Sequence, residues 1–287
     1  MFKNIRYKWA SIFILGIFLF LSMSCSVKSS IETGKIIYVN DDGNADFKTI
    51  QDAINNSLDG DTIFVYNGTY YENVIINKTI NLIGENKETT IIDACGKNNA
   101  VYISAENVEI SGFTIQNSGF YFYSGIYVNS SNNNISDNKI MGNNWGIILA
   151  GSSNNTISSN YIRDNLVYGI MLSISHKNII SQNHLENNGY GLYLKYSSNN
   201  HIAENTLVKN SIQGIYFELF SNNNTIFHNI FKRSLHSAYF EESFSNIWNQ
   251  NYWNKPRILP KPIFGKVNTE KRATFKVEFD REPLFKP

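Results

Sequence analysis

The stretch that decides the fold runs from residue 125 to residue 236 and reads GIYVNSSNNNISDNKIMGNNW, GIILAGSSNNTISSNYIRDNLVY, GIMLSISHKNIISQNHLENNGY, GLYLKYSSNNHIAENTLVKNSIQ and GIYFELFSNNNTIFHNIFKRSLH. It contains five copies of one unit, and each copy opens at a glycine: Gly125, Gly146, Gly169, Gly191 and Gly214. These glycine numbers differ by 21, 23, 22 and 23, and a degenerate sixth copy, SAYFEESFSNIWNQNYW, begins at Ser237. A fixed period of this length predicts a repeat architecture.

Within each copy, apolar residues alternate as they do on a strand with one buried face. Pairs such as Ile126 with Val128 and Ile147 with Leu149 follow the glycine, and a second apolar run comes about ten residues later. The longer helical repeats of the tetratricopeptide and ankyrin kinds are excluded, because the unit is short and has no 3.6-residue period. The leucine spacing of a leucine-rich repeat is also missing. Short strands separated by Asn, Ser and Gly turns therefore predict one coil of a parallel β-helix per copy.

Asparagine occupies two registered positions of the repeat. One set is Asn138, Asn160, Asn183, Asn205 and Asn229, and the other is Asn143, Asn165, Asn188 and Asn210. Asparagine tolerates the left-handed backbone of a sharp turn, and its amide can bond to the same amide one coil above and below. We therefore expect two Asn ladders, with the asparagines themselves in the left-handed conformation.

The segment before the repeats continues the strand pattern less regularly, with apolar runs at 63–65, 74–76, 80–83 and 90–92. Ahead of them, DFKTIQDAINN predicts a short amphipathic helix in which Thr49 and Asp52 resemble a capping box. Such a helix would cover the open end of the coil stack, where strand edges are otherwise unpaired. We predict an all-β parallel β-helix of about eight coils, formed as one domain by residues 36–254, with a short N-terminal capping helix.

The first 25 residues read as an export signal. Positive charges at Lys3, Arg6 and Lys8 precede an apolar run from Trp9 to Met23 that is short for a membrane span. A small residue followed by Cys25 at the end of this run resembles a lipoprotein signal, so Cys25 is a candidate lipidation site. Cleavage elsewhere and an uncleaved anchor remain open. We expect an exported protein, extracellular or at the cell surface.

Composition narrows the classes of partner. A net charge of +1, from 25 basic and 24 acidic residues, excludes a protein whose main partner is nucleic-acid phosphate. Two cysteines exclude a disulfide scaffold. From residue 255 to 287 the chain becomes basic and proline-containing, which predicts a C-terminal tail or cap in which ATFKVEF is one strand lying along the rod.

These residues carry a family resemblance. The stretch from Tyr38 to Asp93, which begins YVNDDGNADF and ends ETTIID, resembles the N-terminal part of pectin-esterase-like and pectin-lyase-like right-handed β-helices. The glycine-led repeats, with the closing SNIWNQNYWN, resemble NosD-type β-helix proteins of archaeal and bacterial cell surfaces. The resemblance implies a right-handed coil and a carbohydrate-active or carbohydrate-binding surface protein, although a fold by itself does not define a function.

A catalytic site is not evident from the pattern. A glycosidase needs two carboxylates about 5 to 10 Å apart, and stacking would bring together acids about 22 residues apart at one repeat position. We identify no such pair in the sequence. The paired Asp motifs and Gly-His-Gly of polygalacturonases, the Gln and Asp motifs of pectin esterases, and the Asp cluster of a pectate-lyase calcium site are also missing. We therefore predict no catalytic residues and no cofactor.

The NosD resemblance also raises copper, because these proteins are linked to copper-enzyme maturation. A copper site needs converging His, Cys or Met side chains. The histidines fall at different repeat positions, and Met141 and Met171 lie apart; the histidines are His176, His184, His201, His228 and His236. We predict no metal site.

An aromatic stripe is the most suggestive surface feature. The position two residues after the glycine should point outward, and it holds Tyr127, Tyr193, Tyr216 and Tyr239. Three readings stay open: the strand preference of aromatic residues, a glycan-stacking surface, and a protein contact. We expect the rings of Tyr193 and Tyr216 about 5 Å apart in a flat strip, beside Lys195 and Glu218, with little contribution to stability.

The leading functional hypothesis is a non-catalytic, exported surface protein that binds or organises polysaccharide or neighbouring surface proteins. Its contact with a membrane would be through the N-terminal signal or anchor. The alternative is a polysaccharide lyase, hydrolase or esterase of the pectin-lyase-like class that acts on acidic glycans.

Overall fold

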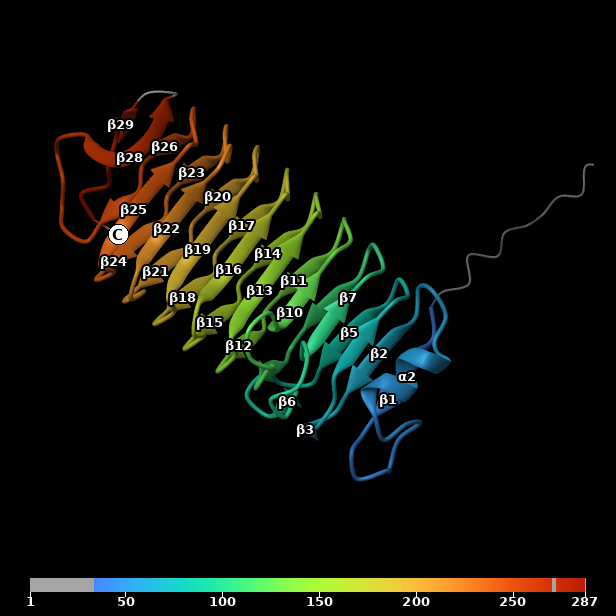
Figure 1. Ribbon diagram of the computed structural model, residues 1–287. Coiled ribbons are helices and arrows are strands. Elements are labelled where there is room, and N and C mark those ends of the chain that lie inside the picture. The colour runs from blue at the N-terminus through green and yellow to red at the C-terminus, as the bar shows by residue number, and fades with distance from the viewer. Residues whose placement is uncertain (1–33, 270–271, 287) are drawn as a thin grey trace, which may run out of the picture. The chain divides into compact units, whose positions relative to one another are not determined.

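The computed structural model describes residues 34–269 and 272–286, so residues 1–25 and the candidate lipidation site Cys25 lie outside the described residues. The described chain forms a right-handed parallel β-helix of about ten turns with about 23 residues in each (Figure 1). The predicted fold is confirmed. The stack is taller than the eight coils expected, because the irregular N-terminal segment and the basic C-terminal segment also contribute strands to it.

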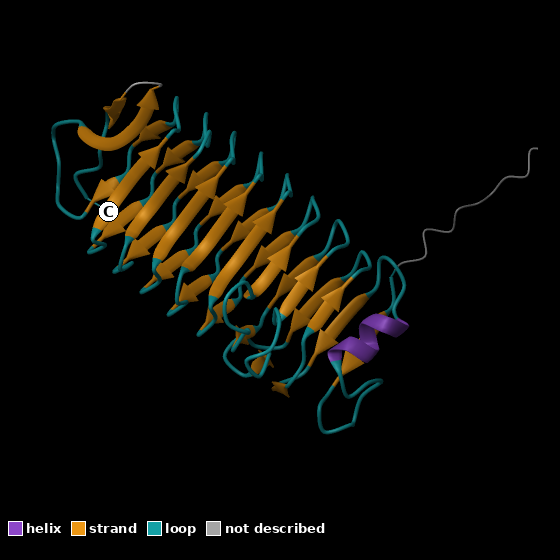
Figure 2. Cartoon of the chain, viewed as in Figure 1, coloured by secondary structure: helices purple, strands orange, loops and turns teal. Residues whose placement is uncertain are grey.

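Strands of successive coils pair in parallel and form three stacks, which appear as layered arrows in Figure 2. Stack 1 contains β1 Ile36–Val39, β2 Thr62–Val65, β5 Asn81–Gly84, β8 Glu109–Ser111, β11 Asn134–Ser136, β14 Thr156–Ser158, β17 Ile179–Ser181, β20 His201–Ala203, β23 Thr225–Phe227, β26 Ile247–Asn249 and β29 Arg272–Asp280.

Stack 2 contains β4 Val74–Ile76, β7 Val101–Ile103, β10 Ser124–Val128, β13 Trp145–Ala150, β16 Tyr168–Ser173, β19 Tyr190–Lys195, β22 Gln213–Glu218, β25 His236–Glu241 and β28 Lys261–Thr269. Stack 3 contains β3 Gly68–Tyr70, β6 Thr90–Asp93, β9 Thr114–Gln116, β12 Lys139–Met141, β15 Tyr161–Arg163, β18 His184–Glu186, β21 Thr206–Val208, β24 Ile230–Lys232 and β27 Tyr252–Trp253. Each full coil visits stack 2, then stack 1, then stack 3.

The register places the same repeat position of every coil directly above the last. Ile147 of β13, for example, pairs with Ile170 of β16. The inward aliphatic side chains are fully buried in every repeat and form one continuous core. Each contributes roughly 2 kcal/mol by leaving water. The register glycines let neighbouring coils approach, because a Cβ on Gly146 would lie 2.3 Å from the carbonyl oxygen of Gly169.

Side-chain amides line the corners of the coil. At the corner between stacks 1 and 3, the backbone N–H and Nδ2 of Asn160 donate to Oδ1 of Asn183 at 3.1 and 3.0 Å. The Nδ2 of Asn160 also donates to the carbonyl of Ile135, 2.9 Å away in the previous coil. The same bonds join each successive pair in this row: Asn138, Asn160, Asn183, Asn205, Asn229 and Asn251. A second row, Asn143, Asn165, Asn188 and Asn210, occupies the corner between stacks 3 and 2.

A third Asn row, which the sequence analysis missed, lies at the corner between stacks 2 and 1. Its members are Asn133, Asn155, Asn178, Asn200, Asn224 and Asn246, all buried. A serine row, Ser152, Ser175, Ser197, Ser221 and Ser243, follows the same corner. The recurring S-x-N-N motif of the repeat contains this row. The row is not evident from the sequence, because the same motif is also typical of a solvated loop. Every corner of the coil therefore has its own column of amides.

The backbone conformation differs from the expectation. The left-handed residue is the one before each ladder asparagine, not the asparagine itself, as at Gln182 with φ of 57° and Lys209 with φ of 51°. This conformation costs an ordinary residue about 1–2 kcal/mol. It is held because strand pairing on both sides and the inward amide fix the corner. Asparagine is required here for its side-chain amide rather than for its backbone tolerance.

The N-terminal end of the solenoid is closed as predicted by a short helix, α2 Ile50–Asn56 (Figure 2). The Thr49 side chain caps it by accepting from the N–H of Asp52 at 3.2 Å. The Glu72 carboxylate accepts from two further N–H groups of the first turn, those of Ile50 and Gln51, at 2.9 Å each. Burial is the main cause of the raised pKa of Glu72. The apolar face of the helix is buried against the first coils.

The C-terminal end is closed by the antiparallel hairpin β28–β29. The strand expected along the rod instead lies in β29 and continues the stacking. Asp280 ends the first Asn row: its Oδ2 accepts from Asn251 N, Asn251 Nδ2 and Trp253 Nε1 at 3.0, 3.1 and 2.8 Å. Glu278 ends the third row by accepting from the N–H of Asn246 at 3.1 Å. A carboxylate suits this place, because the last coil presents donors and needs an acceptor.

We predict that Asn183→Ala lowers the free energy of unfolding by about 3 kcal/mol or more. The change deprives the N–H of Asn160 and the carbonyl of Ile157 of buried partners, and each loss costs about 1–3 kcal/mol. Denaturant unfolding measures the effect. Asn129→Ala is the control, because Asn129 is exposed and lies outside the three rows; equal losses in the two variants would refute the structural role of the amides.

Candidate functional site

The outer face of stack 2 carries the predicted aromatic stripe. Tyr193 of β19, Tyr216 of β22 and Tyr239 of β25 are register neighbours. The ring centroids of Tyr193 and Tyr216 are 5.3 Å apart, and those of Tyr216 and Tyr239 are 5.7 Å apart. The spacing follows from the strand separation of about 4.8 Å. The first pair meets edge to face at 71°, so the rings form a ridged surface and not the flat strip expected.

Tyr127 of β10 stands apart from this group. Its ring stacks on Tyr102 of β7 at 5.7 Å and 28°. Ile148 and Met171 occupy the same position in the two coils between Tyr127 and Tyr193. The four predicted stripe residues therefore belong to two separate aromatic patches on one face.

A second aromatic row runs beside the stripe, at the residue before three of the five register glycines. Trp145 contacts Tyr168 at 5.7 Å, Tyr168 contacts Tyr190 at 5.6 Å, and Tyr190 stacks on Tyr216 at 5.9 Å and 17°. At its N-terminal end the row begins with Phe122, whose ring is 5.9 Å from that of Trp145. We call Phe122, Trp145, Tyr168, Tyr190, Tyr193, Tyr216 and Tyr239 the aromatic track.

Tyr193 is more deeply buried than expected. Only 7% of its surface is exposed, because the rings of Tyr168, Tyr190 and Tyr216 surround it. This burial contradicts the outward, exposed position on which the expected small contribution to stability is based. The other rings of the track lie at least partly exposed. Tyr193 thus packs beneath the surrounding rings, and those rings form the exposed surface of the track.

The structure also reveals an acidic pair that the sequence analysis missed. Glu218 of β22 and Glu241 of β25 occupy one repeat position in consecutive coils and are register partners. The statement that no two acids share a position is therefore wrong. The signal was visible in the motifs YFEL and YFEE, but the sixth copy lacks the register glycine, so the alignment was easily overlooked.

The two carboxylates are held between lysines and tyrosines. The Nζ of Lys195 lies 3.4 Å from Glu218, and the Nζ of Lys266 lies 3.6 Å from Glu241. The Tyr193 hydroxyl donates to Glu218, and the Tyr216 hydroxyl donates to Glu241 at 3.0 Å. The result is a column of four charged groups that borders the track on the same face, with the two glutamates between the two lysines: Lys195, Glu218, Glu241 and Lys266. We call it the charged column.

Burial raises the pKa of the track tyrosines. It is the largest cause at Tyr193 and Tyr216, followed by the hydrogen bonds that their hydroxyls donate to Glu218 and Glu241. The pKa values of Tyr168, Tyr190 and Tyr239 are raised in the same direction, again mainly by burial. These hydroxyl groups therefore stay protonated at neutral pH and act as hydrogen-bond donors.

A charge cluster on stack 3 is a weaker candidate. Arg163 pairs with Asp164 at 2.8 Å, and Lys209 pairs with Glu186 at 3.3 Å. The Tyr161 hydroxyl donates to Glu186, and this hydrogen bond is the main cause of the lowered pKa of that carboxyl. Arg163 and Asp164 are adjacent in the chain, whereas Glu186 is bound from the coils on both sides, by Tyr161 and Lys209, which indicates a role in joining the coils.

Among the residues that the structure describes, no three His, Cys, Asp or Glu side chains lie close enough to hold a metal ion. The histidines have other neighbours: the ring of His228 stacks on Phe227 at 3.8 Å, and Nδ1 of His176 accepts from the N–H of Ser198 at 3.0 Å. No helix within the described ranges has the length and apolar character needed to cross a membrane.

The fold is a right-handed parallel β-helix, and the outer face of its stack 2 carries the aromatic track and the charged column. The chain belongs to the NosD family: the model described as "Periplasmic copper-binding protein (NosD)" matches residues 54–265. The resemblance seen in the repeats is thereby confirmed. No curated protein matches the chain in sequence.

Solved structures share the fold at low identity. ORF18 of Geobacillus virus E2 has a TM-score of 0.59 and 16% identity over 80% of this chain and 59% of its own. The enzymatically active domain of bacteriophage CBA120 tailspike protein 2 has a TM-score of 0.50 and 16% identity over 77% of this chain and 34% of its own. Carrot pectin methylesterase has a TM-score of 0.49 and 15% identity over 76% of this chain and 74% of its own. The chain thus spans 59% of ORF18 and 34% of the tailspike domain.

We predict that Tyr193→Ala destabilises the protein by about 3 kcal/mol, as expected for removal of a buried aromatic ring. Tyr239→Ala, at the more open end of the track, should cost about 1 kcal/mol or less. Urea unfolding of the two variants tests this difference. If Tyr193→Ala were as stable as the parent, the ring would not support the track.

Proposed function

We propose that this protein is a non-catalytic, exported surface protein that binds polysaccharide along the outer face of stack 2. The observation that carries the proposal is the aromatic track, whose ring contacts follow one another from Phe122 to Tyr239 with the charged column beside them. Binding of neighbouring surface proteins by the same face is the competing use.

The geometry of the track favours a chain-like ligand. Its successive centroid distances of 5.6 to 5.9 Å repeat along the solenoid, so a linear polymer can meet one ring after another. The apolar face of a sugar ring stacks on an aromatic ring, and an aromatic contact contributes about 0.5–1.5 kcal/mol beyond its buried area. Affinity would therefore grow with the number of sugar residues bound.

The charged column supplies the polar half of such a site. Carboxylates accept hydrogen bonds from sugar hydroxyls, and lysine ammonium groups donate to them. Because Glu218 and Glu241 are balanced by Lys195 and Lys266, the column has no net charge of its own. This favours a neutral or weakly charged polysaccharide over a polyanion.

A hydrolase is the second candidate, and the Glu218–Glu241 pair is the observation that favours it. Strand neighbours lie about 4.8 Å apart, close to the 5–5.5 Å between the two carboxyl groups of a retaining glycosidase. Against it, each carboxylate is already bound to a lysine and a tyrosine hydroxyl of the protein itself, so both are held in place by contacts that join neighbouring coils.

Export and the domain division complete the proposal. The apolar run before Cys25 supports export through a signal segment, with lipidation of Cys25 as one means of attachment, and the name of the NosD family refers to the periplasm. We propose residues 36–254 as the β-helix domain and residues 255–287 as its C-terminal cap. No nucleic acid is expected as a partner, given the net charge of +1.

A glycan array followed by titration of its hits tests the binding. Tyr190→Ala should weaken binding of the best oligosaccharide by about 2- to 10-fold, the equivalent of one stacked ring. Tyr161→Ala is the matched control, because Tyr161 is a partly exposed tyrosine on stack 3. Equal effects of the two changes, or no hits, would refute the track as a glycan site.

Incubation of the array hits with the parent protein separates binding from hydrolysis. The proposal expects the ligand to be recovered intact, and expects Glu218→Gln and Glu241→Gln to alter affinity only. Cleavage by the parent that is lost in both glutamine variants, with binding retained, would establish the hydrolase instead.

A further inference from the structure

The outer face of the C-terminal hairpin is apolar and uncovered in the part of the chain that the structure describes. Residues that pair directly across β28 and β29 point to the same side: Pro262 with Phe279, Phe264 with Val277, and Lys266 with Phe275. Exposure reaches 79% at Phe275, 56% at Phe264 and 50% at Phe279. The opposite side of the hairpin buries Ile263, Val267 and Asp280 against the last coil. The hairpin thus needs only its inner side to close the solenoid.

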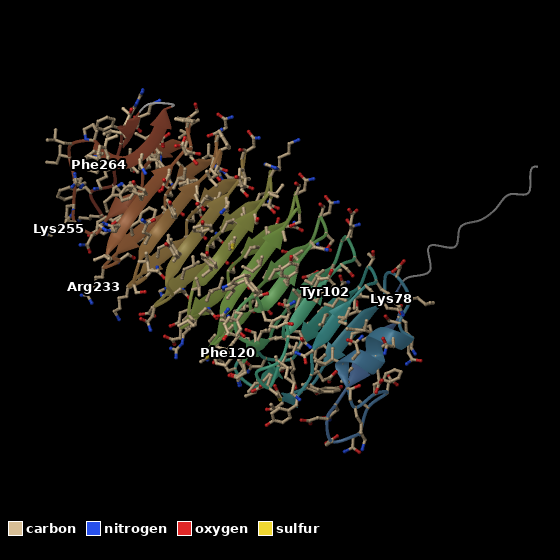
Figure 3. All side chains as sticks on the ribbon, in the orientation of Figure 1. Lys78, Tyr102, Phe120, Arg233, Lys255 and Phe264 are labelled. Carbon is tan, nitrogen blue, oxygen red and sulfur yellow. The ribbon has the colours of Figure 1, made fainter. Side chains whose placement is uncertain are left out.

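Further apolar side chains lie at the same end. Ile258 and Leu259, in the loop that leads into β28, are 87% and 74% exposed. A groove of about 670 Å³ beside β29 is lined in part by Ile247, Val277 and Phe279, with Arg281 among its polar residues. Figure 3 shows Phe264 and Lys255 at this end of the solenoid, far from Lys78 at the other. Exposed apolar side chains gathered at one end of the molecule are typical of an interaction site.

The end is also cationic. Its basic side chains are Lys255, Arg257, Lys261, Lys266, Lys276, Arg281 and Lys286. Within the described residues, only Lys266 of this set forms an ion pair with a carboxylate. Two of the nearby acids, Glu278 and Asp280, are turned to the Asn rows and accept hydrogen bonds there. Burial, and then the charge of Arg257, lowers the pKa of Lys261. The Nζ of Lys261 lies over the ring of Trp253 at 5.9 Å, and that of Lys276 lies over the ring of Phe244 at 4.7 Å, so these two lysines contact the solenoid.

We propose that the C-terminal end of the solenoid docks on the surface of an anionic lipid bilayer. The exposed phenylalanine, isoleucine and leucine side chains enter the interface, and the surrounding lysine and arginine side chains meet lipid phosphates. The two strands of the hairpin are hydrogen-bonded to each other. Only side chains would enter the bilayer, so these backbone hydrogen bonds would stay intact.

The combination of apolar and cationic groups selects this partner. An anionic polysaccharide would satisfy the charges but offers no apolar phase for Phe275 and its neighbours. A second copy of the same face would bring like charges together, which opposes a two-fold dimer. This surface adjoins the outer face of stack 2, because Lys266 also belongs to the charged column, but binding to vesicles is tested without a glycan, so the proposal does not rest on the proposed glycan binding.

A fluorescence-quenching experiment on the full-length chain tests the docking. In a Cys25→Ser, Cys95→Ser background, Phe275→Cys carries a fluorophore, and vesicles contain a nitroxide-labelled lipid. The label should be strongly quenched by vesicles rich in phosphatidylglycerol and far less by phosphatidylcholine vesicles. Leu58→Cys is the control, because Leu58 is 69% exposed at the opposite end of the solenoid, and its label should not be quenched.

Charge removal gives the second readout. Lys255→Gln, Arg257→Gln and Arg281→Gln combined should raise the vesicle concentration needed for half-maximal quenching by about 100-fold, at about 1 kcal/mol per charge, with an unchanged unfolding midpoint. Equal quenching at the two labelled positions, or none at position 275, would overturn the proposal. So would an emission shift at position 275 that depends on protein concentration without vesicles, which would assign the face to a second copy.

Discussion

The hydrogen bond from one asparagine to the asparagine above it is the interaction on which the rest of this structure depends. A coil of about 23 residues has to turn three times, and each turn points backbone N–H and C=O groups inward where no strand can pair with them. An inward amide both accepts and donates. The Oδ1 of Asn160 accepts from the N–H of Asn138, and its Nδ2 donates to the carbonyl of Ile135 and to Oδ1 of Asn183. An alanine side chain in the same place supplies neither the donor nor the acceptor.

Because the amide rows are directional, the two ends of the solenoid have different requirements. The first coils meet a helix, α2, whose free N–H groups are satisfied by Thr49 and Glu72. The last coil presents N–H groups that need acceptors, and the hairpin supplies Asp280 and Glu278. One oxygen of Asp280 is buried without a hydrogen-bond partner, and the other closes the first Asn row.

Because inward positions hold aliphatic side chains and amides, the residue type varies from coil to coil mainly at outward positions. Parallel stacking turns any outward residue type that recurs from coil to coil into a continuous row. That is how separate tyrosines become the aromatic track, and how single lysines and glutamates become the charged column. The outer face of stack 2 continues in the same way onto β28, where Lys266 follows Glu241. The solenoid therefore has one long face whose residue types change along its length.

The sequence by itself determined the coil, because period, alternation and registered asparagines are local features that every copy repeats. It also determined the helix, through Thr49 and the apolar face of the segment that follows. It did not reveal that the residue before each asparagine takes the left-handed conformation, since that choice is made by pairing to the coils on either side. The burial of Tyr193, the partnership of Glu218 with Glu241 and the closure of the amide rows by β29 were likewise decided by the tertiary structure. Each depends on contacts between residues more than twenty positions apart, and such contacts exist only once the coils have stacked.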